Sequence, residues 1–271
     1  MKSDARPLRV DAAAAVVAPP PWRRLAFVSD LHLGDAAPRT TAAFVAWLGG
    51  AARRADALFV LGDLFESWVG DDQLEVDDAA HRVVDALRGY ARDGRALWLQ
   101  RGNRDFLLGD VLAAACGASY LDDPCVLQFG GQRIVLTHGD ALCIADQAYM
   151  RWRAQCRAAG WQAAFSAQPL AARLAQAAAA RQASRTAQGV QENWADADAA
   201  EAARWLHAAD AHWMIHGHTH RPRSHWRDGT LRDVLSDWDL DGAARAEVLW
   251  LERGAGGAIE VRRSAPAATA T

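Results

Sequence analysis

Five short apolar runs along the chain share one pattern: each has the length of a strand and stops abruptly at polar or glycine residues. The runs cover residues 25–29, 57–61, 96–100, 132–137 and 211–215, and they lead into Asp30, Gly62-Asp63, Gly102-Asn103, His138 and His216. Apolar runs of this length that end in turn residues are typical of buried strands. The pattern therefore predicts five strands that each deliver a polar side chain at one end.

Between these runs the apolar residues take up helical spacing. Phe44, Trp47 and Leu48 recur on one helical face, and Thr40 or Thr41 is the expected N-terminal cap of that helix. A second helical segment is expected around residues 81–88, and a short helix over residues 110–115. Strands that alternate with helices predict an α/β layered domain.

The later part of the chain has a different pattern. Residues 126–129 and 132–137 flank Gly130-Gly131, and residues 246–251 and 258–261 flank another glycine-rich stretch, so two hairpins are expected. Residues 146–207 are rich in Ala, Arg and Gln and carry no strand signal. We therefore expect a core domain over residues 23–145 and 208–263, a helical insertion over 146–207, a disordered N-terminal extension over 1–22 and a disordered tail over 264–271.

Composition narrows the classes of protein. The 30 Lys and Arg nearly balance the 33 Asp and Glu, so no nucleic-acid partner is expected. The four cysteines form no C-x-x-C pair, which favours a reducing cytosol over a secreted disulfide framework. No apolar stretch approaches the roughly 20 residues that span a bilayer, so any membrane association should be peripheral.

The polar groups at the strand ends have the chemistry of metal ligands. They are Asp30, His32, Asp63, Asn103, His138, His216 and His218. In α/β folds the carboxyl ends of the strands converge on one rim, and carboxylate, amide oxygen and imidazole suit Mn, Fe or Zn. Each motif alone is compatible with an ordinary turn, but the ordered set indicates a metal site. Its size suits two ions that share a bridging carboxylate.

Five motifs occur in order: Asp30-Leu-His32, Gly62-Asp63, Gly102-Asn-Arg-Asp105, His138-Gly139, and Gly217-His-Thr-His220 with His216 before it. This set resembles the calcineurin-like metallophosphoesterases. Arg104 is a departure, because most members carry there a histidine that protonates the leaving group. With the stretches S-D-L-H-L-G, L-G-D-L-F-E-x-W-x-G-D-D and I-H-G-H-T-H-R-P, this arginine narrows the resemblance to the family that hydrolyses UDP-2,3-diacylglucosamine in lipid A synthesis. The likeness runs from about residue 24 to 261 and is weaker in the insertion.

The resemblance implies a fold, a reaction and a cofactor. The fold is α/β, a β-sandwich flanked by helices in αββα layers, with the insertion as a helical lid. Two Mn²⁺ per monomer are implied, one held by Asp30, His32 and His218, the other by Asn103, His138 and His216, with Asp63 bridging. The implied reaction is attack of metal-activated hydroxide on the α-phosphate, which yields 2,3-diacylglucosamine 1-phosphate and UMP. Its implied catalytic residues are Asp63, Asn103, Arg104 and His216.

The same resemblance implies contacts with the substrate. These are made by Asn103, Arg104, Asp146, Ser184, Gln188, Gln191 and His216. In the family the lid receives the acyl chains on an apolar face, for which the candidates here are Tyr149, Trp152, Trp161, Phe165 and Leu170. The alternative is that these side chains only pin the lid to the domain.

A basic face is also expected on the lid. Its arginines would be Arg153, Arg157, Arg173, Arg181 and Arg185, either for attraction to a bilayer surface or as an ordinary solvated helix face. The lipid substrate implies a peripheral protein on the cytoplasmic face of the inner membrane, in contact with the membrane surface and with no protein partner.

Two other functions stay open from the sequence. A related phosphodiesterase or phosphatase could act on a soluble nucleotide or phosphoester, although such a substrate would not need the aromatic residues of the insertion. A non-catalytic scaffold is disfavoured because no ligand position is lost.

Overall fold

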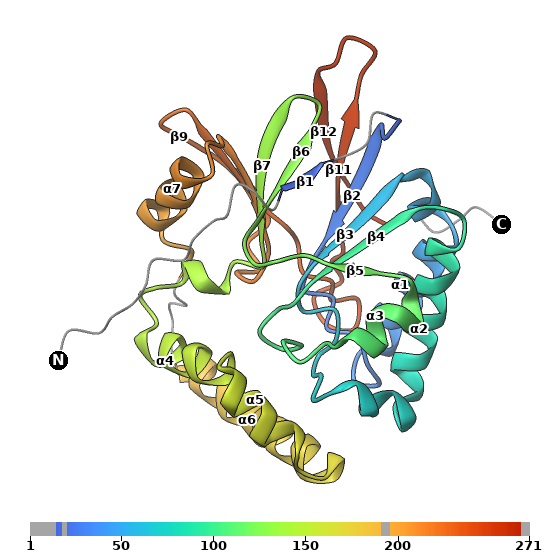
Figure 1. Ribbon diagram of the computed structural model, residues 1–271, viewed down its shortest axis with the longest axis vertical. Coiled ribbons are helices and arrows are strands. Elements are labelled where there is room, and N and C mark those ends of the chain that lie inside the picture. Colours follow the sequence, from blue (N-terminus) through green and yellow to red (C-terminus); the bar gives the residue numbers. More distant parts are fainter. Residues whose placement is uncertain (1–14, 18–20, 191–195, 267–271) are drawn as a thin grey trace.

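Two six-stranded sheets pack face to face, and helices cover their outer surfaces (Figure 1). The computed structural model describes residues 15–17, 21–190 and 196–266, with the backbone alone at 15–17 and 184–190. The layers follow in the order helix, sheet, sheet, helix. This order confirms the predicted αββα architecture.

The first sheet contains the predicted strands of the amino-terminal half. Its order is β12 (Ile259–Ser264), β11 (Val248–Arg253), β2 (Arg24–Val28), β3 (Ala57–Leu61), β4 (Ala96–Gln100) and β5 (Ser119–Tyr120). Strands β2 to β5 are parallel, whereas β11 is antiparallel to both β2 and β12. Val28 pairs with Val60, and Val60 with Leu99, so the loops after these strands begin at almost the same level.

The second sheet contains the predicted hairpin of the middle of the chain. Its order is β1 (Ala15–Val17), β6 (Cys125–Phe129), β7 (Gln132–Thr137), β8 (Trp213–His216), β10 (Thr230–Val234) and β9 (Arg223–Arg227). Strands β6 and β7 form the predicted antiparallel hairpin, and β7 runs parallel to β8. The β9–β10 hairpin was not predicted, because its residues are mostly polar and those of the edge strand β9 are mostly exposed.

The alternation of side chains along β2 explains the two apolar layers on either side of the first sheet. Leu25 and Phe27 point into the space between the sheets, where Phe27 stacks on Phe59 with ring centroids 4.8 Å apart. Ala26 and Val28 point outward to the helices α1 (Pro38–Gly49), α2 (Asp78–Ala91) and α3 (Asp110–Cys116). Short 3₁₀ turns follow at η1 (Ala51–Arg54), η2 (Asp71–Glu75) and η3 (Asp140–Leu142).

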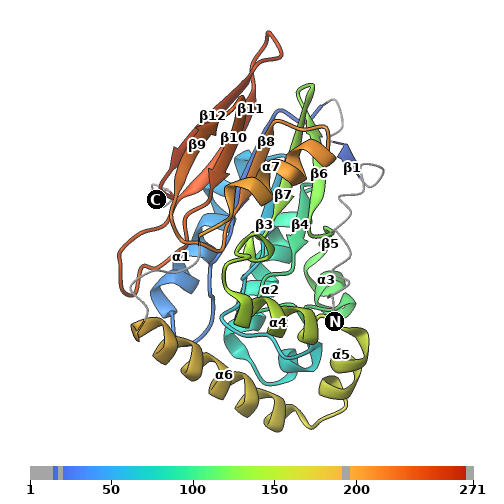
Figure 2. The same ribbon diagram turned by 90° about the vertical axis from the view of Figure 1, so that its left-hand side faces the viewer.

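The predicted insertion separates into two parts. Helices α4 (Gln147–Cys156), α5 (Ala159–Ser166) and α6 (Leu170–Val190) lie apart from the sheets (Figures 1 and 2). Helix α7 (Ala199–Ala208) instead packs on the outer face of the second sheet, where Trp205 and Leu206 join Met214 in a buried cluster. The expected boundary at residue 207 is therefore too late, because the amphipathic α7 belongs to the core.

The expected N-terminal extension over residues 1–22 also needs correction. Ala15 to Val17 form β1, which pairs in parallel with Val126 to Gln128 of β6, and Trp22 packs against the core between the sheets. At the other end, Ser264 is the last residue of β12 rather than part of a tail. Within the two expected disordered segments, residues 1–14, 18–20 and 267–271 lie outside the described residues.

Helix α1 begins earlier than expected. Pro38 occupies its first turn, so Thr40 and Thr41 lie inside the helix and do not cap it. Asp241 takes the capping role from a distant part of the chain, because its carboxylate accepts hydrogen bonds from the backbone N–H groups of Arg39 and Thr40 at 3.0 and 2.9 Å. A cap supplied across 200 residues leaves no local signal.

Candidate metal centre

The predicted ligands gather where the parallel strands end. Asp30, Asp63 and Asn103 follow β2, β3 and β4, while His138 follows β7 and His216 ends β8. Backbone hydrogen bonds join the first two of these loops, since the N–H groups of Leu31 and His32 both donate to the Asp63 carbonyl at 2.9 and 3.1 Å. The site is thus built across both sheets at one rim of the sandwich.

Several site residues have a left-handed backbone although they are not glycine. They are Asp30, His32, Asp63, His218 and His220, with φ between 49° and 66°. This conformation costs a non-glycine residue roughly 1 kcal/mol, and such residues are common at functional sites. Although extended geometry is lost here, Asp30 and His32, two residues apart, still direct their ligand atoms to the same place.

One group of ligands consists of Asp30, His32 and His220. The Nε2 atoms of His32 and His220 are 3.4 Å apart, and His220 Nε2 is 3.3 Å from Asp30 Oδ1. Glu66 lies behind this group, with its Oε2 3.1 Å from His32 Nδ1, so it orients the ring and leaves Nε2 directed toward the other two ligands.

A second group consists of Asp30, Asp63 and His138. The Nδ1–H of His138 donates to the Leu61 carbonyl at 2.9 Å, so its Nε2 faces the site, 3.7 Å from Asp63 Oδ1. Asn103 Oδ1 is 2.9 Å from both His138 Nε2 and His218 Nδ1. All five of these side chains therefore lie within reach of one another.

Asp63 connects the two groups. Its Oδ1 is 3.7 Å from His138 Nε2 in the second group, and its Oδ2 is 4.0 Å from His32 Nε2 in the first. Each oxygen of one carboxylate thus faces a different set of ligands. This geometry suits the bridging role that the resemblance implied.

The division of histidines differs from the implied one. His218 lies beside Asn103 and His138, whereas His220 takes the implied place of His218 next to Asp30 and His32. The left-handed φ values of His218 and His220 account for the directions of their side chains. His220 belongs to the H-G-H-T-H motif, but its role could not be separated from that of its neighbours by spacing alone.

His216 is buried at the same rim but stands outside both groups. Its Nε2 is 3.1 Å from Nη1 of Arg232, and its Nδ1 is 2.9 Å from the Gly217 carbonyl. Burial, together with the guanidinium of Arg232, lowers the pKa of His216 to about 3. The ring is therefore neutral at physiological pH, as a metal ligand must be.

Electrostatics within the two groups favour a cation. Burial would raise the pKa of Asp30, yet the surrounding histidines, His220 foremost, hold that pKa well below its usual range. Burial would lower the pKa of His138, yet Asp63 and Asp30 raise it to about 9, so this imidazole carries a positive charge in the absence of metal. Without metal, the proton on His138 thus balances the negative charge of Asp63 and Asp30, which a bound cation would otherwise neutralise.

The donor set fits divalent metal ions. Asp30 Oδ1 is buried, and its contact with His220 Nε2 at 3.3 Å does not have hydrogen-bond geometry, so this oxygen is available to a cation. The donors are carboxylates, imidazoles and one amide oxygen, which together suit Mn, Fe or Zn. The two groups are therefore candidate sites for divalent metal, with Asp30 and Asp63 between them.

Asp105 holds the loops of the second group together, a role that was not predicted from the sequence. Its buried carboxylate accepts backbone hydrogen bonds from Gly102 at 2.8 Å and Leu64 at 2.7 Å, which ties the loop after β4 to the loop after β3. The approach is so close that a Cβ on Gly102 would lie 2.0 Å from Asp63 Oδ1. Only glycine fits at that position.

Arg104 adjoins the metal centre through its backbone. Its backbone N–H donates to Asp63 Oδ1 at 2.8 Å, so it begins within the metal centre. Its guanidinium forms no ion pair with any carboxylate among the described residues, although its charge helps to lower the pKa of Glu66, where burial acts in the opposite direction. An arginine beside the site that has no carboxylate partner is free to bind a phosphate through two of its three guanidinium nitrogens.

The remaining implied substrate contacts are only partly described. Asp146 is exposed and caps α4, accepting a hydrogen bond from the Tyr149 N–H at 2.9 Å. Ser184 and Gln188 belong to α6, but their side chains lie outside the described part, as does the whole of Gln191. The structure therefore neither brings these four residues together nor separates them.

Aromatic side chains connect the lid to the metal centre. Tyr149 lies over His218 with ring centroids 6.0 Å apart, and it contacts Trp152 at 5.8 Å. Trp152 and Trp161 both contact Phe106, which follows the Gly102–Asp105 motif and was not predicted. Trp161 also stacks on Phe165 at 4.8 Å. Four of the five predicted lid residues thus share one apolar surface that starts at the metal site.

The expected basic face of the lid is wrong for the arginines whose side chains are described. Arg153 and Arg157 approach Asp140, Arg173 pairs with Asp72, and Arg181 pairs with Glu66. These guanidiniums neutralise buried or nearby carboxylates and are not arrayed toward solvent. The side chain of Arg185 is outside the described part.

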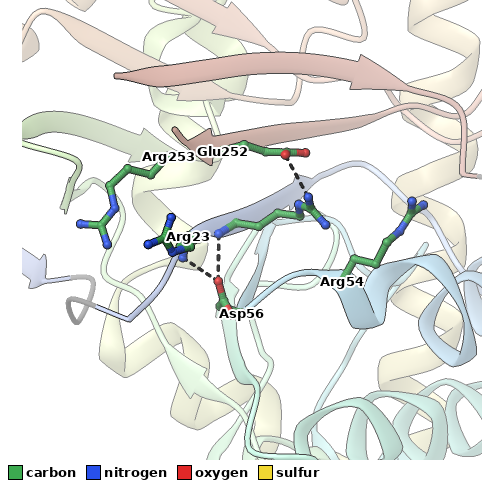
Figure 3. A pocket seen from close by; sticks show the side chains of 6 residues that line it. Arg23, Arg54, Asp56, Glu252 and Arg253 are labelled. Atoms are coloured by element: carbon green, nitrogen blue, oxygen red, sulfur yellow. Dashed lines mark hydrogen bonds and ion pairs between the residues drawn. The ribbon is translucent and has the colours of Figure 1, made fainter. Parts of the chain in front are cut away.

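Away from this site, a polar pocket opens at the opposite rim of the first sheet (Figure 3). Its lining residues are Arg23, Arg24, Arg54, Asp56, Glu252 and Arg253. Arg24 pairs with Glu252 at 3.0 Å, and Asp56 accepts the backbone N–H groups of Arg23 and Arg24 at 2.7 and 2.8 Å. These bonds join strand ends, so the pocket is a structural ion network and not the catalytic site.

Two further predictions concern the chain as a whole. The four cysteines are free and buried, as expected without a disulfide framework. Among the helices of the described ranges, none combines the length and the apolar character needed to cross a bilayer.

Comparison with known proteins agrees with the geometry of the site. Residues 23–222 match the sequence model of the calcineurin-like phosphoesterases. The chain is 45% identical over 240 residues to the UDP-2,3-diacylglucosamine hydrolase of Ralstonia nicotianae. This match covers 84% of this chain and 89% of that protein. Proteins of the same name from Bordetella pertussis and Chromohalobacter salexigens are 44% identical over 232 residues and 43% identical over 221 residues. These matches cover 82% of this chain and 88% of the first protein, and 78% of this chain and 87% of the second. The chain therefore belongs to the calcineurin-like phosphoesterases, within the family of the UDP-2,3-diacylglucosamine hydrolases.

Proposed function

We propose that this protein hydrolyses the pyrophosphate bond of UDP-2,3-diacylglucosamine to 2,3-diacylglucosamine 1-phosphate and UMP. In this reaction the oxygen of a water molecule bonds to the α-phosphorus, and the oxygen that bridges the two phosphates leaves with the lipid. The relatives described above carry the name of this activity.

One observation carries the proposal: the metal centre, Arg104 and an aromatic surface of the lid are continuous. The surface runs from His218 through Tyr149 and Trp152 to Phe106. A polar phosphate and long apolar chains therefore have adjoining places to bind. A soluble nucleotide would leave the aromatic surface in contact with water, which is unfavourable by about 25 cal/mol per Å² of apolar area.

Arg104 also fits the chemistry of the leaving group. Family members with a histidine at this position can protonate an alkoxide that leaves. Here the leaving group is a phosphate monoester, whose second pKa is about 6, so it departs at neutral pH without needing a proton. An arginine that holds phosphate charge is consequently more useful for this substrate than a proton donor.

We further propose that two Mn²⁺ ions occupy the centre, one in each group, with Asp63 between them. Divalent cations bound here would lower the pKa of a water molecule and neutralise charge on the attacked phosphate. The protein's own residues orient the reaction. Glu66 and the Leu61 carbonyl fix the rings of His32 and His138, and Arg104 holds the phosphate.

The lipid substrate supports a peripheral location at the cytoplasmic face of the inner membrane. The substrate's acyl chains would come from the membrane surface, and the exposed Trp152 at 39% accessibility is a suitable first contact for them. Because Arg153, Arg157, Arg173 and Arg181 are engaged in ion pairs, attraction to anionic lipid headgroups is not part of this proposal.

A direct assay tests the proposed function. Purified protein with Mn²⁺ should release UMP and the diacylated sugar 1-phosphate from UDP-2,3-diacylglucosamine, and mass spectrometry should find solvent ¹⁸O in the UMP. Label in the lipid phosphate instead would show attack on the β-phosphate. Faster turnover of UDP-glucose or of a nucleotide diester than of the lipid would favour the soluble-substrate alternative.

A further inference from the structure

Helix α4 sends two arginines one turn apart into the core. The Nε of Arg153 donates to Asp140 Oδ2 at 2.7 Å, and its Nη2 is 3.5 Å from Asp123 Oδ2. The Nη2 of Arg157 donates to the Gly102 carbonyl at 3.0 Å and lies 3.6 Å from Asp140 Oδ2. Residues four apart lie on the same face of a helix, so both guanidiniums point to the same side.

The carboxylates that receive Arg153 flank a metal ligand. Asp140 is two residues after His138, and Asp123 accepts the His138 N–H at 3.3 Å and the Thr137 hydroxyl at 2.5 Å. Arg153 therefore bridges two carboxylates on either side of the loop that presents His138. Tyr149, also on α4, adds a hydrogen bond from its hydroxyl to Asp140 Oδ2.

The contact of Arg157 reaches the other loop of the same metal group. Gly102 directly precedes Asn103, whose Oδ1 is 2.9 Å from His138 Nε2. Arg157 also lies over the ring of Phe106, 5.7 Å from its centroid, in the aromatic surface of the lid. The two arginines of one helix thus contact both loops that carry His138 and Asn103.

Burial makes these contacts strong. Asp140 is fully buried, and the side chains of Arg153 and Arg157 are 14% and 23% exposed. Arg153 Nε lies 2.7 Å and Arg157 Nη2 3.6 Å from Asp140 Oδ2, so this buried carboxylate has two guanidiniums beside it. A buried charge is strongly destabilising without a partner. Helix α4 therefore cannot leave the core without leaving the Asp140 carboxylate unpaired or exposing it to solvent.

We propose that Arg153 and Arg157 are positioning residues, through which the lid helix α4 holds the His138 and Asn103 loops in the geometry that binds the cation. Docking of α4 and cation binding then favour each other, because a coupling between two sites acts in both directions. The proposal rests on the proposed function only in its choice of lipid substrate. Its metal and exchange measurements do not depend on that substrate.

The test compares Arg153→Met and Arg157→Met with a matched control, Arg151→Met, whose side chain is exposed on the same helix. Isothermal titration with Mn²⁺ should show that the group with His138 and Asn103 binds the ion about 10-fold or more weakly in the two variants. This is the usual effect of losing a residue that orients a metal ligand. The control should bind like the wild type. Hydrogen exchange over residues 147–156 should slow when Mn²⁺ is added to the wild type and the control, but not when it is added to the variants.

Activity supplies a third measurement. At saturating Mn²⁺ the variants should recover kcat toward a small phosphodiester, such as bis(4-nitrophenyl) phosphate, while KM for the lipid stays raised by about 10-fold. If the two arginines only stabilise the fold, their loss would lower the melting temperature. It would leave unchanged the Mn²⁺ affinity, kcat for the small phosphodiester and KM for the lipid. That result, or exchange in α4 that responds to Mn²⁺ equally in variants and control, would overturn the proposal.

Two provisions keep the outcome clear. If Arg153→Met does not fold, because Asp140 is left buried without a partner, the double variant Asp140→Asn/Arg153→Met removes both charges and should show the same loss of coupling. If the wild type does not hydrolyse the lipid at all, the proposed function fails, while the titration and exchange measurements still decide the role of α4.

Discussion

Asp63 offers its two carboxylate oxygens to two different imidazoles, His138 and His32. Asp30 is the member common to both groups, whereas Asp63 joins a ring of one group to a ring of the other through its two oxygens. Its loop is fixed by Asp105 below and by the backbone of Arg104 beside it. At the scale of single residues, this carboxylate is the one whose charge the site needs most.

Replacing Asp63 by Asn should reduce turnover by about a hundredfold or more, since effects of 10–100-fold already follow from losing residues that only orient ligands. The fold should survive, because the Asn side chain can still accept the Arg104 N–H. The substitution also removes a repulsion, since burial and then the Asp63 charge raise the pKa of Asp105 to about 6. Activity assays, metal analysis and thermal melting check this. Undiminished activity in folded variant would rule out a bridging role.

Replacing Arg104 by Ala should lower kcat/KM by about 10- to 100-fold, which corresponds to the roughly 1.5–3 kcal/mol of a charged hydrogen bond. The metal content should not change, because the Asp63 contact uses the backbone of Arg104. Arg104→Lys is the matched variant: it keeps the charge but loses the planar fork, so it should recover only part of the activity. Loss of metal in Arg104→Ala would assign the residue a structural role instead.

That polar residues gather at one rim could be predicted from the sequence, because strand runs lead into them and parallel strands end at one rim. The partition of the histidines could not, since His218 and His220 have left-handed φ values that no local pattern encodes. Glu66 and Arg232 were missed for another reason. They act through contacts between segments far apart in the chain, with His32 and His216.

At the scale of elements, the lid is attached to the core through ion pairs and aromatic contacts together. Arg173 of α6 is 3% exposed and donates to the Val69 carbonyl while it pairs with Asp72. The arginines that sequence composition assigned to a solvated face are therefore structural links. Composition reports how many charges a helix carries, but it does not report which way they point.

Trimming the aromatic surface should affect the lipid selectively. In Trp152→Ala/Trp161→Ala, KM for UDP-2,3-diacylglucosamine should rise by about tenfold or more, because burying one large apolar side chain is worth roughly 1.5–3 kcal/mol. A small phosphodiester should be cleaved at the wild-type rate.

Trp226→Ala provides the control for that experiment. Trp226 is 74% exposed on β9, away from the lid, so its loss should change neither substrate. Equal losses with the lipid and with the small diester in the double variant would mean that the tryptophans only hold the lid in place.

Element prediction succeeded where periodicity was strong and failed where tertiary contacts decide. The five buried runs and the β6–β7 hairpin were recovered, whereas the edge hairpin β9–β10 was not. Helix α7 was assigned to the insertion because its sequence is helical like that of the lid. Only its packing on Met214 through Trp205 shows that it belongs to the core.

At the scale of the whole molecule, the metal centre ties the two sheets together. The first sheet supplies Asp30, Asp63 and Asn103, and the second supplies His138 and His216. The alternation of strands and helices along the sequence predicted that such residues meet at one rim of the sheet. It did not predict the pairing of β1 with β6 or of β10 with β8. Those pairings join segments with no shared sequence signal.

Metal removal should make stability depend on pH in a defined direction. In chelator-treated protein the pKa of His138 is raised from 6.5 to about 9, so the folded state binds the proton more tightly than the unfolded state does. The resulting stabilisation is complete below pH 6.5 and is lost as the pH rises through 9. The melting temperature should therefore fall over that range.

Mn²⁺ should remove this dependence, because it binds the deprotonated ring and stabilises the folded state by mass action. Differential scanning calorimetry with and without chelator measures both effects. A chelator-treated protein whose melting temperature rises between pH 6.5 and 9 would contradict the charge assigned to His138. His212→Gln, at an exposed histidine, should leave the profile unchanged.

The left-handed residues at the rim have a consequence for how such a chain changes over generations. A protein released from catalysis would gain stability by exchanging Asp30, His32, Asp63, His218 or His220 for glycine or asparagine, which adopt this backbone at little cost. Drift alone would therefore erase them. We expect the opposite in a chain that still needs its metal centre, where the side chains at these five positions outweigh the cost of their backbone.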